Sequence, residues 1–236
     1  MALPKIIRSR RKTIALIVQA DGSLVVRAPQ RVTNRQIAEI VEQKAEWIRT
    51  RLEQVQARPQ PESHHYSSGE QFWYLGSACP LLVIQARKNR LEFSGGAFRL
   101  SVIPPSHLHL SDGKEEKQRK ALGQILFTAW YRRQAHLVLE ERVSMLAQRY
   151  GFTYRLVKIT SAHTRWGSCS SRGTLSFPWR LVMAPLAVID YVVIHELVHT
   201  VITGHGPDFW ARVQALAPDY KQHIRWLKEN GVTLEV

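Results

Sequence analysis

The chain has 236 residues, of which 44% are hydrophobic, so it can bury a sizeable core in one domain or two small ones. Its two cysteines form no disulfide framework, and no apolar run reaches the roughly 18 residues that a membrane span needs. We therefore expect no membrane association and a cytoplasmic location, since the N-terminus also lacks the apolar region of a secretory signal.

The N-terminal half alternates strand and turn signals. The apolar residues 14–18 and the segment 24–27 flank the turn dipeptide Asp21-Gly22, which predicts a β-hairpin. A helix is expected from Thr33, because Thr33 and Gln36 have capping-box spacing and apolar residues then recur with a 3.6-residue period as far as residue 55. Short strands are predicted over residues 72–84, 91–93 and 98–103.

The C-terminal half is predicted to be mostly helical. A long helix is expected over residues 114–149, with a strand near residues 155–159 and further helices beyond it. These elements predict an α+β protein with a β-rich N-terminal subdomain containing one helix over residues 1–110 and a second domain over residues 111–236. We found no sequence repeats.

Residues 185–203 predict a buried helix with unusual polar residues in it. A proline opens the segment, apolar residues occupy nearly every side, and Gly204 ends it. Within it, His195-Glu196-Leu197-Val198-His199 matches the HExxH pattern of zinc hydrolases. Histidines at positions i and i+4 share one helix face, so both rings can reach one ion with Glu196 beside them.

A metal ion explains this segment economically. A buried polar group without a partner costs roughly 1–3 kcal/mol, and a shared ion would remove most of that cost for the two imidazoles. The alternative is a pair of core histidines hydrogen-bonded to nearby carbonyls. We prefer the metal interpretation, because two histidines that flank a glutamate at this spacing are far less common than one buried histidine.

His205 is the best candidate for a third ligand. The turn at Thr203-Gly204 would bring the chain back toward the helix face it has just left. The interval from His199 matches that of metzincins, but Ile202 stands where they have glycine, and no clear Met-turn is evident. Asp208, just after Pro207, is interpreted as a residue that begins the next helix and not as a ligand.

These residues also carry a resemblance to a known family. The chain resembles the YgjP-like metallopeptidases, strongly over about residues 150–230 and more weakly over its N-terminal half. The main matching segments are Arg165-Trp166-Gly167-Ser168-Cys169-Ser170, residues 175–181, Asp190-Tyr191-Val192-Val193, the HELVH motif, His205, Phe209-Trp210, Pro218-Asp219-Tyr220 and Trp226-Leu227.

The resemblance implies a zincin-like hydrolase related to the SprT and WLM groups. It implies that His195, His199 and His205 bind Zn²⁺ and that Glu196 is the general base. Two positions depart from the family pattern. Pro178 stands where asparagine is usual and Gly206 where serine follows the third histidine, so hydrogen bonds from those side chains are lost here.

The ligand count predicts reactivity. Three imidazoles leave the fourth tetrahedral position of zinc open to water, whose proton Glu196 would take and pass to the leaving group. Candidates for stabilising the developing oxyanion are His163, Arg165 and the backbone of Trp166-Gly167-Ser168. For the remaining polar neighbours we favour structural roles: Asp190 on another helix face, Tyr191 as a core tyrosine and Cys169 as a small buried residue.

The net charge of +14 keeps other functions open. A basic surface attracts polyanions, so a nucleoside triphosphate phosphohydrolase is the second hypothesis and a nucleic-acid-associated protein with a zinc site is the third. The sequence contains no Gly-rich phosphate loop, no helix-turn-helix and no aromatic RNA-binding signature. A zinc-dependent peptidase acting on a peptide or protein substrate is therefore the leading hypothesis, and the sequence does not specify an oligomeric state.

Overall fold

A computed structural model describes residues 4–18, 22–56, 64–104 and 112–236. Its contacts divide the chain into two compact units, Met1–Gln60 and Pro61–Val236. The chain is mixed α+β in composition, with sheets and helices in both units. Among the described residues, no helix combines the length and hydropathy required to cross a membrane.

The first unit is a small three-stranded sheet followed by two helices. Its strands lie in the order β1-β3-β2, with β1 parallel and β2 antiparallel to β3. The pairing of β2 with β3 confirms the predicted hairpin strands, although Asp21 of its turn lies outside the described residues. The elements are β1 (Lys5–Ser9), β2 (Ala15–Val18), β3 (Leu24–Pro29), α1 (Asn34–Gln43) and α2 (Ala45–Gln56).

The helix predicted from Thr33 begins as expected but is interrupted. The Thr33 hydroxyl accepts the Gln36 amide, and the Gln36 side chain accepts the Thr33 amide, which completes the predicted capping box. Lys44 leaves helical geometry with φ −104° and ψ 13°, so two helices replace one. The strand β1 was not predicted, because its five exposed residues show no apolar alternation.

The second unit begins with a four-stranded sheet in the order β4-β5-β7-β6. Its strands are β4 (Gln71–Tyr74), β5 (Ser77–Gln85), β6 (Arg90–Ser94) and β7 (Ala97–Val102). The single strand predicted over residues 72–84 is wrong, because Leu75 and Gly76 take positive φ values of 49° and 82° and reverse the chain. Their amides donate to the carbonyls of Val182 and Met183 over 2.9 and 3.1 Å, which fixes this turn to the segment that precedes the candidate site.

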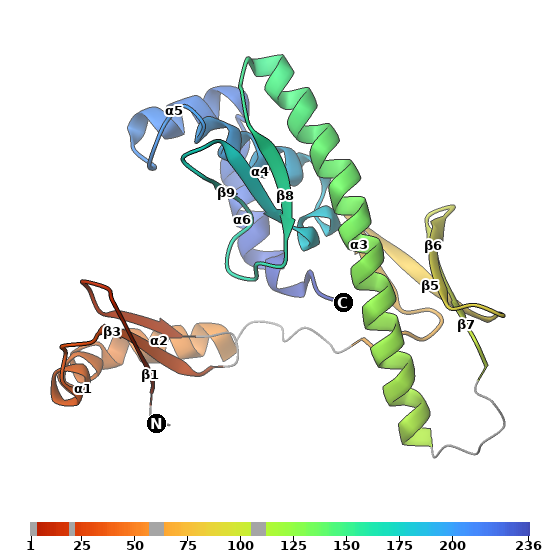
Figure 1. Cartoon of the computed structure of the whole chain (residues 1–236), viewed down its shortest axis with the longest axis horizontal. Coiled ribbons are helices and arrows are strands. Elements are labelled where there is room, and N and C mark those ends of the chain that lie inside the picture. Colours follow the sequence, from red (N-terminus) through yellow and green to blue (C-terminus); the bar gives the residue numbers. More distant parts are fainter. Residues whose placement is uncertain (1–3, 19–21, 57–63, 105–111) are drawn as a thin grey trace. The chain divides into compact units, whose positions relative to one another are not determined.

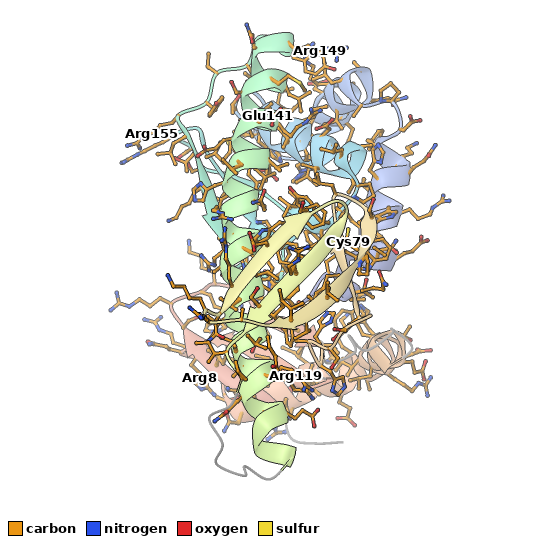
Figure 2. All side chains as sticks on the ribbon, turned by 90° about the vertical axis from the view of Figure 1, so that its right-hand side faces the viewer. Arg8, Cys79, Arg119, Glu141, Arg149 and Arg155 are labelled. Atoms are coloured by element: carbon orange, nitrogen blue, oxygen red, sulfur yellow. The ribbon has the colours of Figure 1, made fainter. Side chains whose placement is uncertain are left out.

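One long helix connects the parts of the second unit. The 39-residue helix α3 (Asp112–Tyr150) runs beside the β4–β7 sheet and continues beside the elements that follow it (Figure 1). Figure 2 shows the same sheet lying across α3, with Arg119 and Arg149 toward the two ends of the helix. Stacked aromatic rings join the sheet to the helix, since the ring centroids of Phe72 and Phe127 are 4.0 Å apart.

The remaining elements carry the candidate site. A three-stranded sheet in the order β8-β10-β9 is followed by a short 3-10 helix and three α-helices. They are β8 (Leu156–Thr160), β9 (Ser168–Cys169), β10 (Thr174–Pro178), η1 (Trp179–Met183), α4 (Leu186–Val198), α5 (Pro207–Leu216), α6 (Tyr220–Asn230) and η2 (Gly231–Thr233). A two-pronged ion pair between Arg142 of α3 and Asp190 of α4, with one nitrogen–oxygen distance of 2.6 Å, ties α4 to the long helix.

The division of the chain differs from the predicted boundary after residue 110. The contacts separate the units between Gln60 and Pro61, so the β4–β7 sheet belongs with α3 and the candidate site. The physical reason is the packing across residue 110, in which Phe72 and Phe98 contact Phe127 and Trp130 of α3. Such contacts between distant segments leave no local signal in the sequence.

Replacing Gly123 in α3 by alanine is expected to destabilise the protein by roughly 1–3 kcal/mol. An added Cβ would lie only 2.5 Å from Cδ1 of the buried Tyr66 ring. Without that ring, the same change in a helix should stabilise by up to about 1 kcal/mol. Urea unfolding of Gly123→Ala, Tyr66→Ala and the double variant measures both effects, and a stabilising Gly123→Ala in the otherwise unchanged chain would contradict this packing.

Candidate metal and catalytic site

The candidate site forms at the C-terminal end of α4. The helix is apolar on almost every side, and Val193, Leu197 and Val198 have no more than traces of exposed surface. It ends at Val198, before the predicted end at residue 203, with His199 as its C-cap. The Thr200 hydroxyl then donates to the Leu197 carbonyl over 2.7 Å, and the chain turns back through the following residues.

The turn brings the three predicted histidines together. Ligand atoms of His195, His199 and His205 all lie within 4.8 Å of one another. The Nε2 atom of His205 is 3.1 Å from Nε2 of His195 and 3.1 Å from Nε2 of His199. A tetrahedral zinc ion with Zn–N bonds of about 2.0–2.1 Å needs nitrogen separations of about 3.3 Å, and these two separations are close to that value.

The surroundings of the histidines favour binding through Nε2. The Nδ1 atom of His199 lies 3.1 Å from the Ile202 carbonyl, to which its N–H donates, and this leaves Nε2 free to bind a metal. The buried Phe209 of α5 packs against all three rings, and it stacks on His199 with a centroid separation of 4.4 Å. Packing and hydrogen bonding thus hold the rings in position before any ion binds.

Burial favours the neutral form of two of these imidazoles, those of His195 and His199. It lowers the pKa of His195 to about 4, with additional repulsion from His199 and His205. Burial also lowers the pKa of His199, while the Ile202 carbonyl opposes that shift. Neutral imidazole is the form that binds a metal, so protons compete weakly for the nitrogens of His195 and His199 at neutral pH.

Glu196 is the carboxylate of the site and is deeply buried, with 4% of its surface exposed. Burial raises its pKa to about 7, and the charge of Arg165 opposes this shift. Its Oε2 atom and Nδ1 of His195 are two of the few buried side-chain polar atoms in the described part of the chain that lack a hydrogen-bond partner. An unpartnered carboxylate oxygen at this depth is costly unless a ligand binds beside it.

Gly167 allows the backbone to approach this carboxylate. A Cβ atom at this position would lie 2.6 Å from Cγ and 2.8 Å from Cδ of Glu196. Any larger residue would displace Glu196 or the strand β9 that follows. Of the predicted oxyanion-stabilising groups, the Trp166-Gly167 backbone therefore lies beside Glu196. His163 instead lines another small cavity, where it contacts the Arg180 guanidinium and Glu235.

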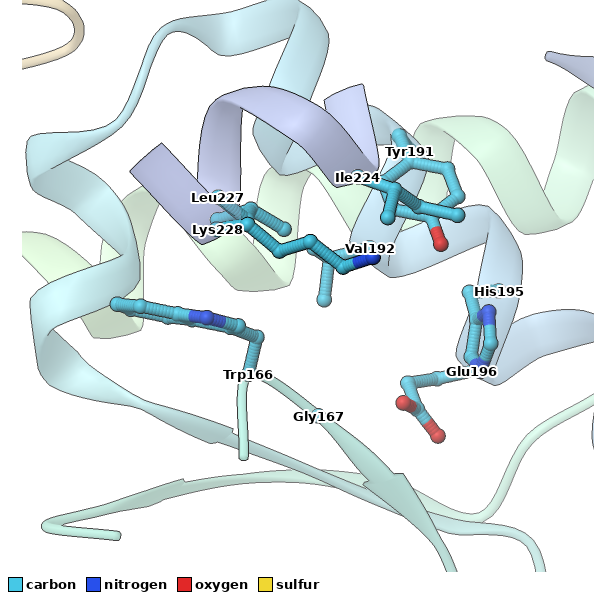
Figure 3. A pocket seen from close by; sticks show the side chains of 9 residues that line it. All are labelled: Trp166, Gly167, Tyr191, Val192, His195, Glu196, Ile224, Leu227 and Lys228. Atoms are coloured by element: carbon cyan, nitrogen blue, oxygen red, sulfur yellow. The ribbon is translucent and has the colours of Figure 1, made fainter. Parts of the chain in front are cut away.

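A cavity of about 290 Å³ opens next to Glu196 and His195. Figure 3 shows the Tyr191 hydroxyl and the Lys228 amino group among the groups that point into it. Burial raises the pKa of Tyr191 to about 12, so its hydroxyl stays protonated and can donate. The lining residues are Trp166, Gly167, Tyr191, Val192, His195, Glu196, Ile224, Leu227 and Lys228.

Other polar residues near the motif lie outside the histidine cluster. Asp190 pairs with Arg142, which confirms its predicted structural role. Asp208 is an exposed residue in the first turn of α5, as predicted. Burial raises the pKa of the Cys169 thiol, whose sulfur donates to the Ser170 carbonyl, so Cys169 is a protonated structural residue.

The sequence did not predict the wall of the cavity formed by α6. Ile224, Leu227 and Lys228 lie on one face of this helix at positions i, i+3 and i+4. The amphipathic pattern of residues 220–230 could have predicted the helix itself. Its position against α4 depends on contacts between distant parts of the chain, and no local pattern reports these.

A comparison with protein families matches most of the chain. A family model described as YgjP-like, metallopeptidase domain, matches residues 12–230. Among solved structures, the chain is similar to the metallopeptidase zymogen of Pyrococcus abyssi abylysin, with 20% sequence identity and a TM-score of 0.32. That similarity covers 36% of this chain and 90% of the other. No curated protein matches the chain.

Zinc is expected to stabilise the protein, and the effect should require all three histidines. At a free zinc concentration of about 100 times Kd, the gain in unfolding free energy should be roughly 2.7 kcal/mol. The variant His205→Ala should lose this gain, whereas His136→Ala, on the exposed surface of α3, should retain it. Thermal unfolding with and without zinc tests the expectation, and full stabilisation of His205→Ala would exclude His205 as a ligand.

Glu196→Gln is expected to stabilise the metal-free protein more at about pH 8 than at about pH 5. Burial raises the pKa of Glu196 from 4.5 to about 7, so the folded state retains a proton that the unfolded state releases between these values. The stability contributed by this group therefore falls as the pH rises through this window, by up to roughly 3 kcal/mol. Glutamine cannot ionise and removes the loss.

Urea unfolding in the presence of a chelator measures this difference. The matched control is Glu141→Gln on the exposed surface of α3, which should change stability little at either pH. An effect of Glu196→Gln that does not vary between the two pH values would show that Glu196 titrates normally in the folded protein.

Proposed function

We propose that this chain, which belongs to the YgjP-like metallopeptidase family, is a zinc-dependent peptidase whose C-terminal part is a zincin-like domain with α4 as its active-site helix. The observation that carries the proposal is the convergence of three Nε2 atoms next to a buried glutamate with an unpartnered oxygen. An open site of three nitrogen ligands is typical of catalytic zinc, whereas structural zinc sites are closed by four protein ligands.

The proposed ligands are His195 and His199 from α4 and its C-cap, and His205 from the turn that follows. Zinc bound there would supply a Lewis acid for the scissile carbonyl and lower the pKa of a water molecule to about 7. The hydrogen bond from His199 to the Ile202 carbonyl and the packing of Phe209 would hold two of the ligand rings in orientation.

Glu196 is the proposed general base and acid. Its raised pKa, about 7, lies close to the operating pH, which is the condition for a group that takes a proton from water and then gives it to the leaving amine. Gly167 lets the backbone before β9 approach this carboxylate, so the peptide groups of Trp166 and Gly167 border the space in which the substrate would react. Tyr191 supplies a protonated hydroxyl to the same cavity.

The lining of the cavity favours a peptide over a nucleotide. Val192, Ile224 and Leu227 present hydrocarbon next to Glu196, and Lys228 is the one lysine or arginine among the lining residues. A triphosphate carries several negative charges and calls for several cations or a bound magnesium ion. The histidine triad is the one cluster of potential metal ligands in the described ranges, and no carboxylate is among its three members.

Zinc-loaded protein is expected to cleave an unfolded protein substrate, and Glu196→Gln should lower this activity by roughly 100-fold or more, because general acid–base catalysis contributes on that order. The variant should still bind zinc, since the three histidines remain. Fluorescent-casein hydrolysis and zinc content per chain measure the two properties. Glu141→Gln is the matched control and should retain activity.

The same preparations should be tested on nucleoside triphosphates with a phosphate-release assay. No release dependent on Glu196 is expected. Release that requires Glu196, together with no cleavage of casein, would replace the peptidase proposal with the phosphohydrolase hypothesis.

A further inference from the structure

The cavity next to Glu196 contains an unpaired positive charge. Lys228 reaches it from α6, and Figure 3 shows its amino group pointing into the cavity with the carboxylate of Glu196 on another side. None of the ion pairs among the described residues involves Lys228. An amino group directed into a cavity, with no protein anion bound to it, is available to a ligand.

The rest of the lining is mainly apolar. Val192, Ile224 and Leu227 supply hydrocarbon, and Trp166 adds the face of an indole ring. Lys228 is exposed, so water weakens its attraction to an anionic group, and a ligand that fills the cavity displaces only part of that water. The lining therefore suits a side chain with an aliphatic stem and a carboxylate at its end.

The position of the cavity indicates which part of a peptide would enter it. In the proposed reaction Glu196 gives a proton to the leaving amine, so the residue that contributes this amine must lie against Glu196. The cavity borders Glu196 directly and extends from it along α4 toward Tyr191 and Val192. The side chain on the amine side of the scissile bond is thus the group nearest to the cavity.

We propose that Lys228 is a specificity-determining residue that selects peptides presenting a carboxylate on the amine side of the cleaved bond. The proposal rests on the peptidase function proposed above and names its substrate class. Two sources can supply the carboxylate: a glutamate or aspartate side chain at that position, or the terminal carboxylate of a substrate whose last residue is released. Lys228 meets the same chemical group in both cases.

The first experiment maps cleavage sites. Zinc-loaded protein digests casein, and mass spectrometry of the products gives the residue on the amine side of each cut bond. Glutamate and aspartate should be enriched there by roughly fivefold, since a partly exposed charge pair contributes about 1 kcal/mol. Lys228→Met should abolish the enrichment and Lys228→Glu should replace it with lysine and arginine.

Lys221→Glu is the matched control. Lys221 is an exposed residue of the same helix that does not line the cavity, so the variant changes the net charge as Lys228→Glu does and should keep the original preference. Release of single terminal residues, blocked when a peptide substrate is amidated, would identify the terminal carboxylate as the source. An identical residue distribution for the unchanged protein and Lys228→Glu would overturn the proposal.

The second experiment does not depend on turnover. Calorimetry measures the binding of two acetylated hexapeptide amides, identical except for glutamate or glutamine at the fourth position, to zinc-loaded Glu196→Gln. The glutamate peptide should bind roughly fivefold more tightly, and adding Lys228→Met should remove the difference. The glutamine peptide with a free terminal carboxylate is measured beside them, as the probe for the second source. Equal affinities of all three peptides, or no binding of any of them, would contradict a carboxylate-selective cavity.

The two experiments separate the two proposals. If the unchanged protein does not cleave casein but zinc-loaded Glu196→Gln still prefers the glutamate peptide through Lys228, the peptidase proposal fails and the carboxylate site stands. If casein is cleaved without any preference on the amine side and the peptides bind equally, the peptidase proposal stands and the role of Lys228 is lost.

Discussion

The burial of polar groups in α4 is the constraint from which the organisation of the site follows. Glu196 and His195 sit in a helix whose other buried residues are almost all hydrocarbon, and each has a polar atom without a protein partner. Each such atom lowers the free energy of unfolding by roughly 1–3 kcal/mol, which is a large share of the stability of a typical domain. A metal ion shared by the three Nε2 atoms, with a water molecule beside Glu196, would remove this cost for the Glu196 oxygen.

Several elements hold the site in place around that helix. The turn at Leu75-Gly76 is hydrogen-bonded to η1. It also lies close to the start of α4, because an added Cβ at Gly76 would lie 2.8 Å from the Cα atom of Pro185. Arg142 fixes the middle of α4 to α3 through Asp190. The β4–β7 sheet, although distant in sequence, thus supports the segment from which the proposed catalytic residues project.

The candidate site was largely predictable because its signal is local. The spacing of His195, Glu196 and His199 on one helix face, and the return of the chain at Gly204 toward His205, both follow from backbone geometry over a few residues. The same holds for the capping box at Thr33 and the strands of the first hairpin.

Features that depend on distant contacts were not predictable. Leu75 takes a positive φ although it is not glycine, and only the carbonyls of η1 explain the turn there. The division near residue 60 reflects aromatic packing across residue 110, and Lys228 borders the site only because α6 packs against α4. A sequence pattern cannot report which surfaces of separate helices will meet.

The most direct test of the account is X-ray absorption spectroscopy of the zinc-loaded protein at the zinc edge. Binding by three histidines and one water molecule predicts only nitrogen and oxygen neighbours at about 2.0–2.1 Å, with outer-shell scattering from imidazole rings. A sulfur neighbour at about 2.3 Å would place Cys169 or Cys79 on the metal and contradict an open, catalytic site of three histidines.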